Sequence, residues 1–456
     1  MAIGARQLAM PAPACCDVQA MATQVGEQAR IAEQPTHVRY WVIVFAVTLA
    51  VITYIDRVAM SFAAPQVSRD LGLTQVQMGM AFSAFVTAYA LFEIPSGFLG
   101  DWMGPRKVLM RIVIWWSAFI AFTGVTWNFA SLFATQTLFG AGEAGCFPNL
   151  TKAFTIWLPR AERVRAQGIL WLSARWGGAF TPLLAYLIFQ FMTWRHTFMV
   201  FGIIGLVWAI FFYRWFHDDP RQNKKVNAAE LELLRPNREL AASHAHVPWA
   251  KLARSRTTWL LCAQYFCLSY GWYFYVTWLP TYLQKSRGVT IGKSAVLSVL
   301  PLFLGGLGSL FCGLISAPLA RSLGSVARTR KVMACLGFTG ASLLLVVSIH
   351  MPNPVATMVV MGLASFCNDL VMPGSWGSCM DVGGKYAGTL SGAMNMLGNF
   401  GGAVSPTAIG LILYWTHNNW DAAFYVSAAV YFCGSFFWLV MDPVTPLDAA
   451  EKSLAV

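Results

Sequence analysis

The sequence predicts an all-α membrane protein with twelve transmembrane helices in two pseudo-symmetric six-helix halves. Three observations lead to this fold class. Of the 456 residues, 57% are hydrophobic and only 11% are charged, whereas soluble domains carry about 25% charged residues. Long apolar runs recur on both sides of a polar central stretch. A short glycine-rich motif in the first half also returns in the second half.

Each apolar run is long enough to cross a hydrocarbon core of about 30 Å at about 1.5 Å per residue. In the first half we expect helices at 40–63, 75–99, 108–126, 131–154, 166–190 and 197–215. In the second half we expect them at 258–284, 294–319, 331–350, 355–380, 387–414 and 422–441. The predicted domains are a disordered N-terminal tail (1–38), a first bundle (39–216), a central loop (217–256), a second bundle (257–442) and a C-terminal tail (443–456).

The basic residues set the predicted orientation. Most of the 32 Lys and Arg residues fall on one side of the predicted membrane, in the tails, the central loop and alternate connecting loops. Five fall on the other side: Arg69, Arg195, Lys285, Arg287 and Lys293. The positive-inside rule then predicts that both termini lie in the cytoplasm. We expect the protein to lie in a bacterial inner membrane, with lipid around its bundles.

Composition excludes several classes of function. The sequence has no basic stretch with interleaved aromatic residues, so we expect no nucleic-acid partner. The net charge of +12 instead reflects the excess of Lys and Arg on the cytoplasmic side of the predicted membrane. The ten cysteines mostly lie in apolar runs without the paired spacings of a metal site, so we expect no metal and no cofactor. A membrane-embedded enzyme is the alternative from another class, but no nucleophile, metal cluster or phosphate-binding loop supports it.

An internal repeat supports the division into halves. The segment Gly177-Gly178-Ala179-Phe180-Thr181-Pro182 returns 224 residues later as Gly401-Gly402-Ala403-Val404-Ser405-Pro406. Gly168 and Gly392 keep the same offset. The repeat places the fifth and eleventh helices at equivalent positions of a duplicated unit, as in many transporters.

A charged loop follows the second predicted helix. Its Gly-x-x-x-Asp-x-x-Gly-x-Arg-Lys pattern is similar to the signature loop of the major facilitator superfamily, which implies a twelve-helix transporter. Asp101 can cap a neighbouring helix or pair with a cation between the halves, and such contacts can hold one conformation and release it in another. The corresponding loop of the second half keeps Gly324 but lacks the Asp. We expect a conformational role for Gly97, Asp101, Gly104, Arg106 and Lys107.

Six ionisable residues lie inside predicted spans, where such groups are costly and indicate function. They are Asp56, Arg57, Glu93, Glu143, Arg175 and Asp369. The planar fork of Arg57 suits a carboxylate, although a salt bridge at the helix end is the structural alternative. Small residues around Glu143 favour an inward-facing carboxyl that can exchange protons.

The chain resembles the anion:cation symporter family of this superfamily over about Tyr40 to Asp442. Three motifs carry the resemblance: Tyr-x-Asp-Arg in the first helix, Glu-Ala-x-x-Phe-Pro in the fourth, and a seventh-helix segment from Tyr275 to Leu283. The family implies an organic-anion substrate taken up with protons. It also implies anion binding by Arg57, protonation of Asp56 and Glu143, and a pocket containing Tyr54, Tyr89, Tyr275 and Asn395.

The chain departs from the family in its second cation. Where relatives often carry Arg one heptad before the fourth-helix Glu, this sequence has Gln136, and the fifth helix instead carries Arg175. We expect the second pocket cation to have moved to Arg175. We also expect Gln136, and Trp171 one turn before Arg175, to face the pocket. The alternative is that Arg175 forms a structural bridge to Glu143.

Further polar residues lie on the second predicted helix and on two helices of the second half. Asn395 and Asn399 form a polar stripe with Ser391 on the eleventh helix, and Asn399 corresponds to Arg175 by the 224-residue offset. We expect the two asparagines to face the pocket, although interhelical hydrogen bonds are the alternative. Glu93 and Asp369 are candidates for gating or coupling, or for structural partners of a loop cation.

Together these observations predict a secondary active transporter that imports an organic anion with protons by alternating access, acting as a monomer. Amides, tyrosines and arginines suit hydroxylated carboxylates, so we expect a sugar acid such as a hexuronate, aldonate or aldarate. An aromatic or dicarboxylic acid, phthalate- or tartrate-like, is the alternative substrate.

Overall fold

The computed structural model describes residues 34–240 and 247–447, and these residues form helices and their connections. Most of the two predicted tails lies outside the described residues. The first half begins with the 3-10 helix η1 (Val38–Tyr40). It continues with α2 (Trp41–Leu71), α3 (Gln75–Met103), α4 (Pro105–Thr123), α5 (Phe129–Glu143), α6 (Cys146–Trp157), α7 (Arg160–Phe189) and α8 (Trp194–Trp215).

A central segment of short helices separates the halves: η2 (Pro220–Gln222), α9 (Ala228–Leu233), η3 (Arg235–Leu240) and α10 (Trp249–Arg254). The second half contains α11 (Arg256–Thr277), α12 (Leu279–Lys285), α13 (Ile291–Leu323), α14 (Val326–Ile349), α15 (Pro354–Gly383), η4 (Gly384–Tyr386), α16 (Ala387–Trp415) and α17 (Trp420–Val440). Each predicted span corresponds to an observed helix or helix pair.

Two spans that we expected to be continuous are broken. The fourth span is interrupted between α5 and α6, where Gly145 has a left-handed φ of 81°, a conformation that glycine adopts without steric cost. The seventh is interrupted between α11 and α12, with Pro280 in the first turn of α12. The first break leaves Glu143 as the last residue of α5, so the carboxyl lies at a helix end rather than within a helix.

The packing of the two halves follows one scheme. In the first half α2 packs on α7, α3 on α5 and α4 on α8. In the second half the equivalent pairs are α11 with α16, α13 with α15 and α14 with α17. Contacts between halves obey the same symmetry, because α3 packs on α16 and α7 packs on α13. This arrangement confirms the duplicated unit inferred from the repeat.

The repeated glycines explain how these helices approach one another. A Cβ on Gly168 would lie 2.6 Å from the Ser309 carbonyl oxygen, and one on Gly392 would lie 2.7 Å from the Glu93 carbonyl oxygen. Both contacts join the two halves. Gly178 and Gly402 instead make room within each half, for the rings of Tyr54 and Tyr273 respectively.

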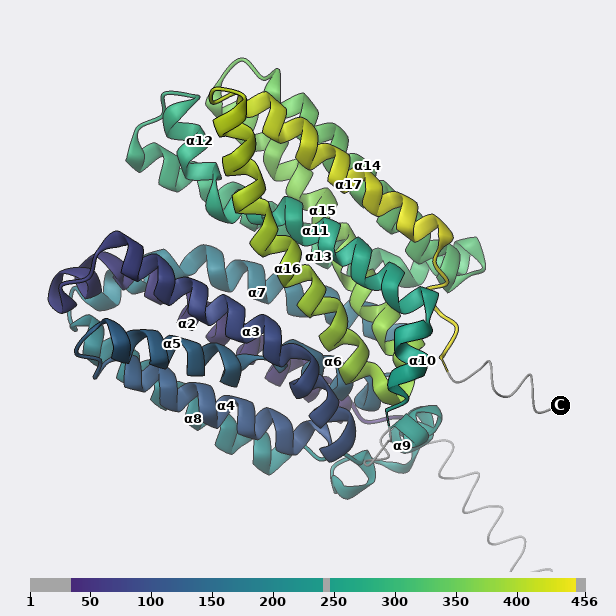
Figure 1. Ribbon diagram of the computed structural model, residues 1–456. Helices are drawn as coiled ribbons and strands as arrows, with labels where there is room; N and C mark the ends of the chain where they lie inside the picture. The colour runs from purple at the N-terminus through teal and green to yellow at the C-terminus, as the bar shows by residue number, and fades with distance from the viewer. Residues whose placement is uncertain (1–33, 241–246, 448–456) are drawn as a thin grey trace, which may run out of the picture.

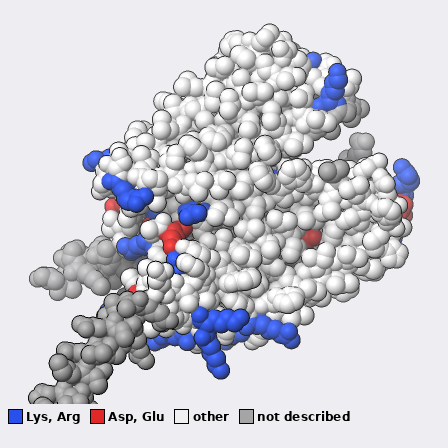
Figure 2. Space-filling model, turned by 180° about the vertical axis from the view of Figure 1, so that it is seen from behind, with Lys and Arg blue, Asp and Glu red and all other residues white. Residues whose placement is uncertain are grey.

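The two halves meet at one end and separate toward the other (Figure 1). We call the end that carries α9, α10 and the start of α7 and α16 the basic end; it is the expected cytoplasmic end. Seen from behind, a notch divides the halves at the opposite end, and many of the Lys and Arg side chains gather toward the basic end (Figure 2). The described conformation is therefore closed at the basic end.

The outer surface suits a lipid environment. Seven helical stretches in the described ranges are long and apolar enough to cross a membrane by length and composition. Large apolar side chains are exposed at helical spacing along the outside of α8 and α17, including Ile203, Val207, Ile210, Phe432 and Phe436. Such continuous exposed apolar surface indicates contact with a membrane.

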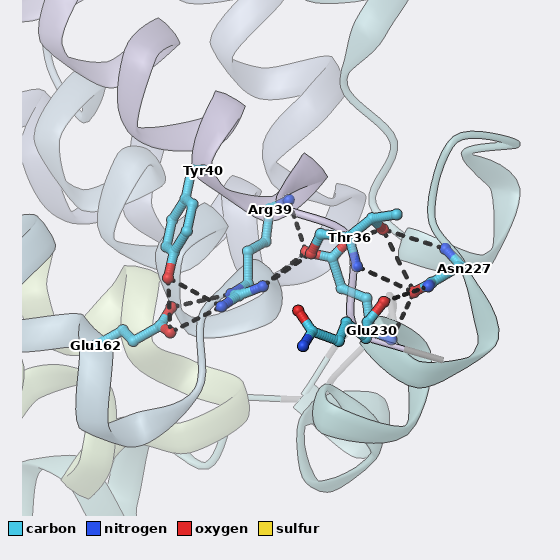
Figure 3. A network of polar contacts seen from close by, with 7 residues as sticks. Thr36, Arg39, Tyr40, Glu162, Asn227 and Glu230 are labelled. Carbon is cyan, nitrogen blue, oxygen red and sulfur yellow. Dashed lines mark hydrogen bonds and ion pairs between the residues drawn. The ribbon is translucent and has the colours of Figure 1, made fainter. Parts of the chain in front are cut away.

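A buried polar network joins the residues just before α2 to the central segment (Figure 3). The Arg39 guanidinium donates to Glu230 at 3.0 Å and to both carboxylate oxygens of Glu162 on α7. Thr36 also donates to Glu230. The Glu230 side chain is fully buried, so Arg39 supplies the charge that makes its burial tolerable.

We expect Arg39→Ala to lower stability strongly, because it leaves Glu230 buried without its cation. Breaking a buried pair in this way costs about 3–5 kcal/mol, which thermal unfolding of the purified protein will detect as a fall in Tm. Arg221→Ala is the matched control, since Arg221 pairs with Asp219 on the exposed surface and such pairs contribute about 0–1 kcal/mol. Equal effects of the two changes would contradict this role of Arg39.

Candidate functional site

A cavity lies between the two halves and contains about 70 Å³ of space that water can reach. Helices α2, α3, α6 and α7 of the first half and α11, α15 and α16 of the second line it. Its lining residues are mostly aromatic or polar: Tyr54, Arg57, Tyr89, Phe147, Trp171, Arg175, Tyr265, Leu268, Ser269, Trp272, Tyr273, Met372, Asn395 and Asn399. Among these described residues, the charged side chains are two arginines and no acid.

The Arg57 guanidinium has N–H groups that no described residue accepts a hydrogen bond from. Its Nε donates to Glu143 Oε1 at 2.6 Å, which orients the side chain. Its Nη2 is buried without a hydrogen-bond partner among the described residues. The guanidinium lies over the Tyr89 ring, 4.3 Å from its centroid. A planar fork held in this way is suited to bidentate binding of a carboxylate or sulfonate.

The two acids predicted to carry protons both lie beside this cation and outside the cavity lining. Glu143 Oε1 accepts from Arg57, while Oε2 is buried without a partner in the described structure. Asp56 is 1% exposed, and neither of its carboxylate oxygens has a partner there. Asp56 therefore does not neutralise its neighbour Arg57. Buried carboxylates with unsatisfied oxygens are costly and mark candidate functional groups.

Arg175 pairs with Asp369, and this corrects the expected alternative of a bridge to Glu143. Its Nε donates to Asp369 Oδ2 at 2.7 Å and its Nη2 to Oδ1 at 2.9 Å. The pair joins α7 of the first half to α15 of the second. The guanidinium also lies over the Trp272 ring at 3.3 Å. The expected pocket cation is thus in the cavity wall, bound to an acid of the opposite half.

Asn395 connects the cavity to a buried acid. Its Nδ2 donates to Glu93 Oε1 at 2.7 Å and lies 3.4 Å from the Tyr89 hydroxyl. These bonds run from α16 to α3 and therefore cross between the halves. Asn399 lines the cavity and donates to the Asn395 carbonyl. Glu93 is placed between the cavity and the basic end, where a change in substrate occupancy can affect the contact between halves.

An aromatic wall closes one side of the cavity. The Phe147 and Trp171 rings stack with centroids 4.9 Å apart, and Trp171 lies 5.4 Å from Trp376. Trp171 is therefore part of the cavity wall. Two expected pocket residues, Gln136 and Tyr275, are buried but are not among the lining residues. Tyr275 instead packs against Phe274 and Trp272.

The signature loop closes the basic end. Asp101 accepts from the backbone N–H groups of Gly388 and Thr389 at 3.0 and 2.6 Å, so it caps α16 of the other half, where the helix dipole favours an anion. Gly97 makes this approach possible, since a Cβ there would collide with the Gly388 carbonyl oxygen. Lys152 pairs with Asp101 at 3.3 Å.

The remaining loop residues contact the segment after α8. Gly104 has a φ of 87°, and a Cβ there would meet the Asp218 carboxylate. Asp218 accepts from the Arg106 N–H at 2.9 Å, and burial raises the pKa of its carboxyl above the usual range. Lys107 is exposed.

A second contact between halves was not foreseen. Asp381, at the end of α15, binds Arg163 of α7 at 2.9 Å and Arg330 of α14 at 2.6 Å. It supplies the acid that the loop before α14 lacks. Lys152 was also overlooked, although an ionisable residue inside the predicted span 131–154 is the same signal that singled out Glu143.

Comparison with known proteins agrees with this architecture. The family model described as Major Facilitator Superfamily matches residues 46–406. A probable sulfoacetate transporter of Cupriavidus necator is 34% identical over 88% of this chain and 93% of its own length. A probable galactarate/D-glucarate transporter of Escherichia coli is 30% identical over 89% and 93% respectively. The crystal structure of an E. coli fucose:proton symporter matches with a TM-score of 0.66 at 14% identity, over 87% of this chain and 97% of that chain.

The chain belongs to the major facilitator superfamily, and its relatives confirm the anion:cation symporter resemblance. It is a multi-pass membrane transporter rather than an enzyme, and the transporters it is similar to carry small organic anions. The twelve-span fold predicted from the sequence is confirmed by the family and by the solved neighbour.

Proposed function

We propose that the protein imports a small organic anion together with protons across a bacterial inner membrane, by alternating access, as a monomer with both termini in the cytoplasm. The substrate is a sugar acid such as a hexuronate, aldonate or aldarate. The observation that carries the proposal is the Arg57 guanidinium, which lines the cavity with a buried Nη2 that has no partner in the described structure.

A sulfonated carboxylate is the second candidate substrate. The relative named for sulfoacetate is 34% identical, and the space of about 70 Å³ in this conformation favours a compact solute. Sulfonates and carboxylates offer a guanidinium the same paired oxygens, so either fits the free face of Arg57. An aromatic or other dicarboxylic acid remains the alternative within the same mechanism.

In the proposed cycle, the anion enters from the open end and binds the free face of Arg57. The anion then competes with Glu143 for the positive charge. A carboxylate that loses its cation in a buried site is strongly unfavourable, so Glu143 takes up a proton as the anion binds. Asp56, buried beside it without a partner, is the second proton carrier.

The conformational step then breaks the contacts of Asp101 and Asp381 at the basic end. These contacts are contributed by both halves, so their rupture lets the halves rock and opens the cavity to the other side. Substrate and protons leave there. The bound anion neutralises the charge of Arg57, and the protons neutralise the two acids. This lowers the free-energy cost of carrying charged groups through a closed site.

Uptake into proteoliposomes tests the proposal. Protein is reconstituted with a neutral interior and an acidic exterior, and accumulation of labelled D-glucarate, D-galactonate and sulfoacetate is followed. We expect concentrative uptake of at least one of these acids that stops when a protonophore collapses the pH gradient. Uptake that stays concentrative after complete collapse would argue against proton coupling. Absence of uptake or exchange of every acid offered would argue against the organic-acid assignment.

A further inference from the structure

Arg175 and Asp369 form an ion pair between the halves at the middle of the bundle. Arg175 lies at the centre of α7 and Asp369 at the centre of α15. Their side chains are 2% and 0% exposed and are joined by two hydrogen bonds in parallel. The contacts of Asp101 and Asp381, by contrast, lie at helix ends. This pair is therefore the ionic contact between halves that adjoins the cavity.

The two partners face the cavity differently. Arg175 lines it, whereas Asp369 is not among the lining residues and lies behind the guanidinium. Asp369 is held in place from its own half. Asn368 Nδ2 donates to Oδ1 at 2.7 Å, and Gly305 of α13 leaves room for Oδ2, since a Cβ there would lie 2.8 Å away.

Arg175 also keeps one nitrogen for a ligand. Its Nε and Nη2 are used by Asp369, while Nη1 makes no hydrogen bond to the described part of the chain. The Trp272 ring covers one face of the guanidinium. An anion in the cavity can therefore approach Nη1 first and then replace the carboxylate of Asp369 without moving the arginine.

Arg57 offers a comparable arrangement within the first half. Its Nε is bound to Glu143, its Nη2 has no partner among the described residues, and the side chain lines the cavity. The cavity thus displays two guanidinium groups, each neutralised from behind by one buried acid. A substrate with one acidic group can engage one of them, whereas a substrate with two can engage both.

We propose that the protein selects small dianions, because the second acidic group of the substrate displaces Asp369 from Arg175 and so opens the central ion pair between the halves. This inference rests on the proposed function and narrows its substrate class. A monoanion bound at Arg57 leaves the pair between α7 and α15 intact. Binding of the dianion, in contrast, exchanges a contact between halves for a contact with substrate. Asp369 takes up a proton as it loses its cation, because an unpaired buried carboxylate is strongly unfavourable. The exchange links occupancy to the rocking movement.

The test is equilibrium binding to the purified protein in lipid nanodiscs, measured by calorimetry with two acids that differ in one group. D-glucarate carries two carboxylates and D-gluconate carries one. The test variant is Arg175→Gln/Asp369→Asn, which removes both charges and leaves no buried ion unpaired. The control variant is Arg163→Gln/Arg330→Gln/Asp381→Asn, which removes the buried ionic cluster at the end of α15, away from the cavity, and leaves neither of its two buried arginines without a carboxylate.

For the unchanged protein we expect D-glucarate to bind at least about tenfold more tightly than D-gluconate, the effect of one hydrogen-bonded charge contact. The test variant should bring the two affinities within about twofold of each other by weakening D-glucarate alone. The control variant should change both affinities by the same factor and keep their ratio. Asp369→Asn alone should tighten D-glucarate binding severalfold, because no carboxylate has to be displaced.

The inference is overturned if the ratio of the D-glucarate and D-gluconate affinities is unchanged in the test variant, or if it falls equally in the control variant. Either result leaves organic-anion binding intact. Equal affinity of the unchanged protein for the two acids overturns it as well. If the unchanged protein binds neither acid, nor sulfoacetate as a shorter dianion, the proposed function fails and the inference fails with it.

Discussion

We expect Arg57→Gln to weaken binding and uptake of the organic anion by about 100-fold or more. The Arg57 side chain lines the cavity, and the two N–H groups of its buried Nη2 have no hydrogen-bond partner in the described part of the chain. Each hydrogen bond to a charged group contributes about 1.5–3 kcal/mol, so losing two of them gives this magnitude. Initial rates of labelled uptake, normalised to folded protein, measure the effect.

Two further variants separate binding from folding. Arg57→Gln/Glu143→Gln leaves no buried carboxylate without its cation, and it should be as inactive as the single change. Arg287→Gln is the matched control, because Arg287 is hydrogen-bonded to Thr357 and Tyr282 near α12 and does not line the cavity. Near-normal uptake by either Arg57 variant would exclude Arg57 as the anion-binding group.

The second large effect is expected at Glu143. Glu143→Gln keeps a hydrogen-bond acceptor for Arg57 Nε but cannot take up a proton, so it separates substrate binding from proton transfer. Accumulation driven by a pH gradient should fall at least about tenfold. Exchange of external labelled substrate for internal unlabelled substrate, which needs no net proton movement, should stay within about threefold of the unchanged protein.

Asp70→Asn serves as the control for this change, since Asp70 accepts from Trp194 and does not line the cavity. It should support both accumulation and exchange. If Glu143→Gln retains gradient-driven accumulation, another group carries the proton, and Asp56 is the next to test. If Glu143→Gln loses exchange to the same degree as accumulation, Glu143 acts in binding rather than in coupling.

Much of the fold could be predicted because lipid imposes strict rules on sequence. Scarcity of charge, twelve apolar runs and the 224-residue repeat predict every observed span. Most bounds agree within a few residues, but α2 extends to Leu71 rather than 63 and α7 begins at Arg160 rather than 166. The two helix breaks were missed, because glycine and proline are also common inside unbroken membrane helices. Only the observed left-handed φ of Gly145 distinguishes the break from a packing glycine.

The sequence predicted which residues form the candidate site better than it predicted which of them pair with each other. Rare ionisable residues inside spans identified Arg57, Glu143, Arg175 and Asp369, and the structure brings all four to the cavity or directly behind it. The partner of Arg175 was not predicted. Asp369 lies 194 residues away, and sequence periodicity indicates which face of a helix is buried but not which distant helix lies opposite.

The contacts that close the basic end show the same limit. Asp101 could be assigned a capping or pairing role, and it caps α16 while Lys152 pairs with it. Asp381 stands at the end of a span, where acidic residues are ordinary, so nothing local in the sequence distinguishes it. Its function as the meeting point of Arg163 and Arg330 arises only from three-dimensional packing.

The central claim is that the cavity between the halves binds the organic anion through Arg57 and Arg175. The most direct measurement is a cryo-electron microscopy map of the protein in nanodiscs, saturated with whichever acid shows uptake and compared with a map recorded without it. The account predicts added density between the two guanidinium groups, with Asp369 displaced when the acid is a dianion. Density for the bound acid at any other place, with both arginines still paired to their carboxylates, would contradict it.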